Sequence, residues 1–141
     1  MKLKLHLFII LACFSISFTN AQKLSKTEKK IITSIENNNS EAIAFLEKVV
    51  NINSGTLNPK GVKEVGMVFQ EEFKNIDFKT RWVEMPSEMN RAGHLFAETT
   101  GEKGKKLLII GHLDTVFEED SPFQKFEKIN DSIAHAPGGN D

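Results

Sequence analysis

The fold is decided by residues 107–116, which read Leu-Leu-Ile-Ile-Gly-His-Leu-Asp-Thr-Val. The first four form a continuous apolar run, which predicts a central strand covered on both faces. Gly-His-x-Asp follows at the carboxyl end of this strand, where open α/β sheets place their ligand sites. Because side chains alternate faces along a strand, we expect His112 and Asp114 to point the same way. The segment therefore predicts a buried strand that delivers both side chains to one site.

A histidine and an aspartate at this spacing suit a metal site. A metal-bound histidine usually donates its other ring N–H to a carboxylate, which fixes the tautomer and the ring direction. We therefore expect His112 to bind a metal and Asp114 to orient it. Gly111 leaves room where a backbone or an ion must come close. On spacing alone, a purely structural histidine–aspartate pair remains an equal alternative.

The second candidate is the C-terminal segment Ala-Pro-Gly-Gly-Asn-Asp, residues 136–141. Its Pro-Gly-Gly turn delivers Asp141 onto a tightly shaped loop. Such a carboxylate can bridge two metal ions a few ångströms apart. Taken by itself, the segment is more typical of an ordinary polar turn.

The rest of the chain predicts helices followed by strands, an order that indicates an α/β sandwich. We expect a solvated helix over 23–38 that breaks at the three asparagines 37–39. A second helix is expected to be capped by Ser40, and a third to begin at Pro59 and bury a face that extends to Ile76. The expected strands cover residues 78–84, with Trp82 in the core, and residues 94–98, followed by a weak hairpin around residues 130–131.

Residues 1–21 have the three parts of a secretory signal peptide. A basic start (Lys2, Lys4) is followed by an apolar run over 7–14 and a small-residue exit, with cleavage expected between Ala21 and Gln22. The run is shorter than the roughly 20 residues that span a bilayer. We therefore expect an exported protein, periplasmic or extracellular, whose mature domain is residues 22–141. The alternatives are a buried N-terminal helix or, because Ile-Leu-Ala precedes Cys13, a lipid-anchored cysteine.

Charge excludes some classes of partner. Two of the 18 basic residues and none of the 19 acidic ones lie in the signal segment, which leaves 16 basic against 19 acidic, a net charge of −3. Such a mildly acidic composition gives no basic field for nucleic acid or for anionic lipid. Since Cys13 is the sole cysteine, the mature domain is expected to contain no disulfide and to rely on its core or on metal. We expect no nucleic acid partner, and no membrane association unless Cys13 is lipidated.

The two motifs together resemble the di-zinc peptidase family of glutamate carboxypeptidase, aminoacylase and succinyl-diaminopimelate desuccinylase. Gly-His-Leu-Asp-Thr-Val follows an apolar strand, and Pro-Gly-x-x-Asp comes about 25 residues later. Residues 49–56 and Pro122-Phe123 also fit, so that the similarity covers residues 40–141. Two departures concern the second turn: Ala136 stands where the family usually has glycine, and Gly139 stands where a small or branched apolar residue is usual.

The resemblance implies an N-terminal portion of a zinc-exopeptidase-like catalytic domain, with a central, mostly parallel or mixed sheet and flanking helices. It implies two zinc ions, with His112 as a ligand of the first, Asp141 as the bridging carboxylate and Asp114 as the catalytic residue that supports His112. The implied reaction is hydrolysis of a peptide or N-acyl amide bond near a free carboxylate, on a small peptide or N-acyl amino acid. The resemblance is also compatible with a homodimer of the full-length protein.

The family also has a Glu-Glu pair after the bridging aspartate, a further acidic ligand, a late histidine and an inserted lid domain. We therefore expect the 141-residue chain itself to be an inactive fragment. The alternative is a secreted fragment or degenerate homologue with a binding role only. His94 and His135 are expected to be exposed and not to bind metal, and the acidic run 118–120 to be a solvated loop.

Overall fold

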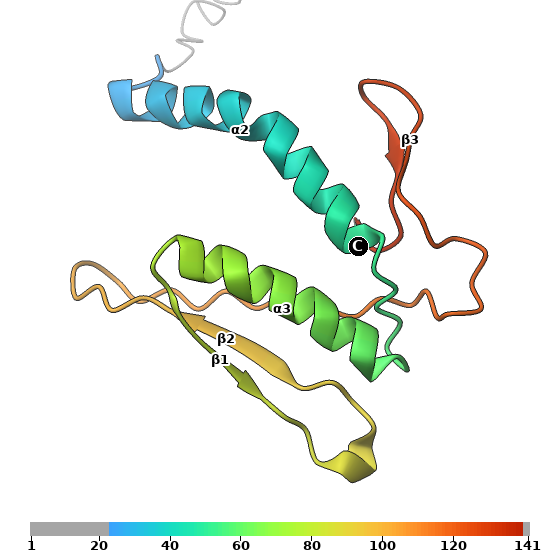
Figure 1. Cartoon of the computed structure of the whole chain (residues 1–141). Coiled ribbons are helices and arrows are strands. Elements are labelled where there is room, and N and C mark those ends of the chain that lie inside the picture. The colour runs from blue at the N-terminus through green and yellow to red at the C-terminus, as the bar shows by residue number, and fades with distance from the viewer. Residues whose placement is uncertain (1–22, 140–141) are drawn as a thin grey trace, which may run out of the picture. The chain divides into compact units, whose positions relative to one another are not determined.

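The computed structural model describes residues 23–139, which divide into two compact units, one ending at Asn39 and one starting at Ser40. Figure 1 shows the elements in chain order. They are α2 (Lys26–Val50), α3 (Pro59–Asn75), β1 (Lys79–Val83), the short 3-10 helix η1 (Ser87–Met89), β2 (His94–Glu98), β3 (Glu127–Lys128) and β4 (Ala134–His135). No helix in this range is long and apolar enough to cross a membrane. The expected signal segment, with Cys13, lies outside the described residues.

Helix α2 begins with a reciprocal cap. The Ser25 hydroxyl accepts a hydrogen bond from the Glu28 N–H (3.2 Å), and the Glu28 carboxylate accepts one from the Ser25 N–H (2.6 Å). This arrangement satisfies two amides that a helix start otherwise leaves unpaired. Hydrogen bonding of the Glu28 carboxylate to Ser25, first to its side chain and then to its backbone N–H, lowers the pKa of Glu28. The exposed isoleucines of the following turns agree with the predicted solvated helix.

The predicted break at Asn37–Asn39 is wrong, and Ser40 does not cap a second helix, because α2 runs through both. Asparagine costs well under 1 kcal/mol in a helix interior, which is too little to end a helix with good neighbours. Asn38 also turns its side chain back along the helix, where its amide donates to the Ser34 carbonyl at 2.7 Å.

Helix α3 starts where the sequence predicts. The Asn58 side chain caps it by accepting from the Gly61 N–H at 3.1 Å, and Pro59 occupies the first turn. Val62 and Val65 are buried on its inner face, but Ile76, which we expected there, is 62% exposed. The helix ends at Asn75, one residue earlier, so Ile76 turns away from the stripe.

The two predicted strands are present as β1 and β2, and they form an antiparallel hairpin that packs against α3 (Figure 1). Its register pairs Trp82 with Leu95 and Val83 with His94. Gly66 allows this close packing, since a side chain on Gly66 would collide with the Trp82 ring. The Trp82 indole N–H donates to the Ala92 carbonyl at 3.2 Å. Trp82 is therefore a packing residue, as predicted.

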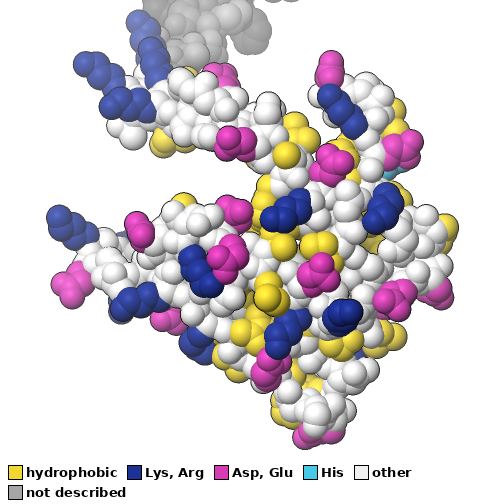
Figure 2. All heavy atoms as spheres, in the orientation of Figure 1, with side chains coloured by type: hydrophobic (Ala, Val, Ile, Leu, Met, Phe, Trp, Pro, Cys, Tyr) yellow, Lys and Arg dark blue, Asp and Glu magenta, His cyan; other side chains and the backbone are white. Residues whose placement is uncertain are grey.

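The end of α2 joins this core through an edge-to-face contact of Phe45 with Phe69, whose ring centroids lie 5.2 Å apart. The weak hairpin predicted around residues 130–131 is also present, as the antiparallel pair β3 and β4. Acidic and basic side chains are interspersed over the face seen in Figure 2, without a field of one sign.

The strand predicted at Leu107–Ile110 is not formed in the structure. The described residues show no ladder for this segment, and its four side chains are 80–83% exposed. A strand needs a neighbour to accept its backbone hydrogen bonds, and no described segment lies in register with this one. The two described sheets are two-stranded and antiparallel. Parallel pairing is confined, within residues 23–139, to one bridge between Gly55 and Thr115.

Candidate functional site

That parallel bridge holds the loop before α3 against the His-x-Asp segment. The Thr115 N–H donates to the Ser54 carbonyl at 2.8 Å, and the Thr56 N–H donates to the Thr115 carbonyl at 3.0 Å. Ser54 and Gly55 are buried. Two loops far apart in the sequence are thus fixed side by side, and the residues after Ile110 acquire a defined path.

Asn53 secures the same junction from the other end. Its amide nitrogen donates to the Phe117 carbonyl (2.9 Å) and to the Gln124 side-chain oxygen (2.7 Å). Its side-chain oxygen accepts from the Gly55 N–H (3.2 Å) and from the Asn58 amide (3.0 Å). All four contacts are partly shielded from water. One side chain therefore ties the loop before α3 to both segments that follow the His-x-Asp motif.

Glu118 adds a further tie, which corrects the expectation that residues 118–120 form a solvated loop. Glu118 is half-buried, and its carboxylate oxygens accept from the Leu57 N–H at 3.1 and 3.2 Å. Glu119 and Asp120 are exposed, as expected. The sequence signal for this role was weak, because an acidic run beside a turn is usually a solvated surface.

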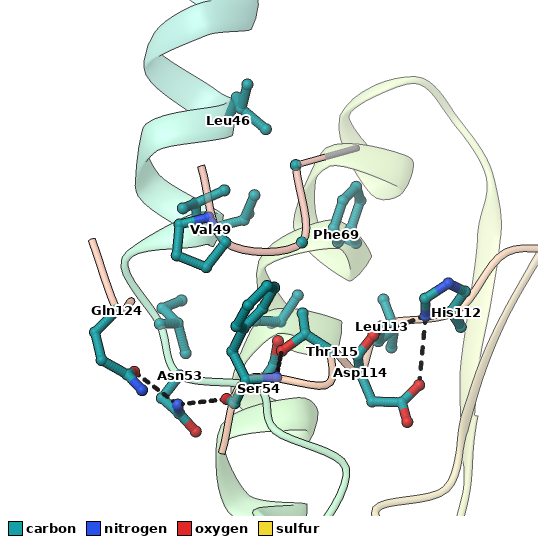
Figure 3. Close-up of a pocket in the computed structure, with 17 residues that line it drawn as sticks. Leu46, Val49, Asn53, Ser54, Phe69, His112, Leu113, Asp114, Thr115 and Gln124 are labelled. Carbon is teal, nitrogen blue, oxygen red and sulfur yellow. Dashed lines mark hydrogen bonds and ion pairs between the residues drawn. The ribbon is translucent and has the colours of Figure 1, made fainter. Parts of the chain in front are cut away.

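The structure brings His112 and Asp114 together (Figure 3). The His112 Nδ1 lies 2.7 Å from the Asp114 carbonyl oxygen and 3.5 Å from its carboxylate Oδ1. Both of these are acceptors, so we assign the proton to Nδ1 and the lone pair to Nε2. An imidazole in this tautomer can bind a metal through Nε2. The His112 side chain is 60% exposed and that of Asp114 37%, so solvent reaches the ring.

The Pro-Gly-Gly turn lies against the same segment. Gly138 has a φ of +66°, and a side chain on it would meet the Thr115 methyl group. The Gly139 N–H closes the turn on the Ala136 carbonyl at 2.9 Å, and Pro137 is buried. Asp141 lies outside the described residues, and its expected approach to His112 remains a prediction.

These segments enclose a pocket of about 420 Å³, drawn in Figure 3. Its volume falls in the range of small-molecule sites. Apolar side chains from α2 and α3 form part of the wall, and His112 and Asp114 are the ionisable residues among those that line it. The lining is completed by polar groups of the loop before α3 and by the second turn; it comprises Leu46, Val49, Val50, Ile52, Asn53, Ser54, Val65, Phe69, Leu113, Thr115, Phe117, Gln124, Pro137, Gly138 and Gly139.

The metal-ligating groups within residues 23–139 do not make a complete site, because no three side chains of histidine, cysteine, aspartate or glutamate converge there. His94 and His135 are both exposed, as expected. His135 Nδ1 lies 3.8 Å from the Glu127 carboxylate, across the β3–β4 hairpin. Unlike His135 and Glu127, His112 and its Asp114 partner line the pocket, and an imidazole with a carboxylate partner is a donor set that fits zinc; within residues 23–139 this pair supplies one ligand.

Sequence reasoning missed Asn53, Thr56 and Gln124 as parts of this site. The stretch Asn-Ser-Gly-Thr at 53–56 was interpreted as a loop before a helix and as part of the family resemblance, but no site role was assigned to its side chains. Its polar side chains reach partners 58–71 positions away. Contacts of that range leave no local period, so only the fold reveals them.

Comparison with known proteins supports a relationship to a peptidase. The chain is 25% identical over 139 residues to carboxypeptidase G2 of Pseudomonas sp. (strain RS-16), a match that covers 98% of this chain and 33% of that protein. The chain thus spans about a third of the length of this curated relative. No family model matches the sequence, and no solved structure matches the fold.

Proposed function

We propose that this chain belongs to a zinc-dependent hydrolase of the carboxypeptidase type, which cleaves a peptide or N-acyl amide bond near a free carboxylate. The observation that carries the proposal is the His112–Asp114 pair at the wall of a pocket that also contains the Pro-Gly-Gly turn. The similarity to carboxypeptidase G2 supports the reaction class.

Each residue has a distinct part in this proposal. His112 would hold the metal through Nε2, and Asp114 would keep the proton on Nδ1 and the ring in place. Asp141 would bridge two ions. When bound, zinc polarises a carbonyl group and lowers the pKa of a coordinated water molecule towards neutrality. Catalytic zinc normally has three protein ligands and an open position, so further ligands and a general base would come from outside residues 23–139.

The fold proposal rests on the exposed run Leu107–Ile110. Four neighbouring apolar side chains that are at least 80% exposed form a patch that soluble proteins normally cover. We propose that this segment forms a strand inside a larger α/β sheet, with His112 just beyond its carboxyl end. Export with cleavage before Gln22 is proposed on the sequence alone, and N-terminal sequencing of the secreted protein tests it.

The reaction is tested by assaying the complete gene product on peptides with C-terminal glutamate and on N-acyl amino acids, with and without a metal chelator. We expect turnover that the chelator abolishes and zinc restores, and no turnover from residues 1–141 alone. Asp114→Asn should retain much of the zinc but slow the reaction, because it changes only the orientation and basicity of His112. A gene product that binds these compounds without cleaving them would support a binding role instead.

A further inference from the structure

We propose that Thr56 is a positioning residue for the metal site, acting through Asp114 on His112. The inference rests on the proposed function, since it assigns Thr56 a part in holding the same histidine. Thr56 lies in the loop before α3, 56 positions before His112, at the end of the stretch 49–56, to which the sequence assigned no site residue.

The Thr56 hydroxyl lies 2.6 Å from Asp114 Oδ2 and 3.1 Å from the Thr115 carbonyl oxygen. A hydroxyl carries one proton and can donate fully to one of them. The contact to the carboxylate is shorter and is assisted by its charge. The Thr115 carbonyl already accepts the Thr56 N–H at 3.0 Å. The hydroxyl proton therefore goes to Asp114.

This donor occupies one carboxylate oxygen, and the other faces the imidazole. Oδ2 accepts from Thr56, while Oδ1 lies 3.5 Å from His112 Nδ1. With Oδ2 held, rotation of the carboxylate about its last bond is restricted, and Oδ1 stays on the side of the ring. The hydrogen bond of His112 Nδ1 itself goes to the Asp114 carbonyl at 2.7 Å, so the carboxylate acts on the ring as a nearby charge. The three side chains thus form a chain of contacts from Thr56 through Asp114 to His112.

The Thr56 side chain is itself well fixed. Thr56 is half-buried, and the parallel bridge holds the backbone on both sides of Gly55. Glu118 binds the next amide, that of Leu57. Because Thr56 is β-branched, few side-chain rotamers are open to it. The hydroxyl is therefore preorganised before any metal binds, which is the condition for a positioning role.

Two matched variants test the hydroxyl. Thr56→Val keeps the shape and removes the donor, whereas Thr56→Ser keeps the donor. We expect Thr56→Val to weaken zinc binding by the complete gene product about tenfold, in the range of lost outer-shell partners. Thr56→Ser should stay within about twofold of the wild type. In the hydrolysis assay, Thr56→Val should lower kcat and leave KM unchanged.

A second readout needs neither metal nor activity. The ¹⁵N shifts of the His112 ring in the zinc-free protein, above the pKa of imidazole, report the share of the Nδ1–H tautomer. Because the Asp114 carbonyl at 2.7 Å still accepts from Nδ1, this share should fall only in part in Thr56→Val, and it should recover in Thr56→Ser. If the wild type binds no zinc, the proposed function fails, and the ring shifts alone decide the role of Thr56. Equal shifts in all three proteins, or equal losses in both variants, would overturn the inference.

Discussion

The replacement Asn53→Ala tests the junction that builds the pocket. It removes four hydrogen bonds at once, to Phe117, Gln124, Gly55 and Asn58. Each contributes about 1 kcal/mol net, which sets an upper value of about 4 kcal/mol. Because the site is half-buried and water can replace some partners, we expect the free energy of unfolding to fall by about 2–4 kcal/mol.

Trp82 is the sole tryptophan, and its indole packs between the hairpin and α3, so its fluorescence reports the unfolding of the second unit. With a urea dependence of about 1–3 kcal/mol per molar, the midpoint should drop by at least about 0.7 M. Asn75→Ala is the matched control, because Asn75 is exposed at the last position of α3; it should change stability by less than about 0.5 kcal/mol. A change in Asn53→Ala no larger than in this control would refute the role given to Asn53.

Two further predictions concern α2 and the exposed apolar run. The pKa of Glu28 is lowered by its hydrogen bonds to Ser25, so the stability it gives to the start of α2 is present above the ordinary glutamate pKa. That stability is lost as the pH falls below about 4, and the protection factors of amides near residue 28, which correct for intrinsic exchange, should fall there in the wild type but change less in Ser25→Ala. The double variant Leu108→Lys and Ile110→Lys should reduce self-association of the 141-residue chain, because both side chains are at least 80% exposed. Light scattering at equal protein concentration measures the self-association. Unchanged association would show that another surface is responsible.

Local patterns predicted the local elements well. The sequence predicted strands over 78–84 and 94–98, where β1 and β2 lie, and Pro59 predicted the start of α3. The break at Asn37–Asn39 failed because the helical penalty of asparagine is small compared with the cap and neighbours that favour one continuous α2. Composition alone does not show whether the asparagine penalty or the favourable cap and neighbours decide where a helix ends.

Non-local structure was harder to predict. The run Leu107–Ile110 has the composition of a central strand, but a strand exists only with a partner, and none of the described segments supplies one. His112 and Asp114 were found because their pairing is local, two positions apart. Thr56 and Asn53 were missed because their partners lie more than 50 positions away.

The central claim is that His112 holds a catalytic zinc ion. The most direct test measures zinc content and turnover of the complete gene product in His112→Ala, with His94→Ala as control, because His94 is an exposed histidine at the start of β2. We predict that His112→Ala loses one zinc ion per chain and nearly all turnover, while His94→Ala keeps both. Full zinc content and wild-type turnover in His112→Ala would contradict the account.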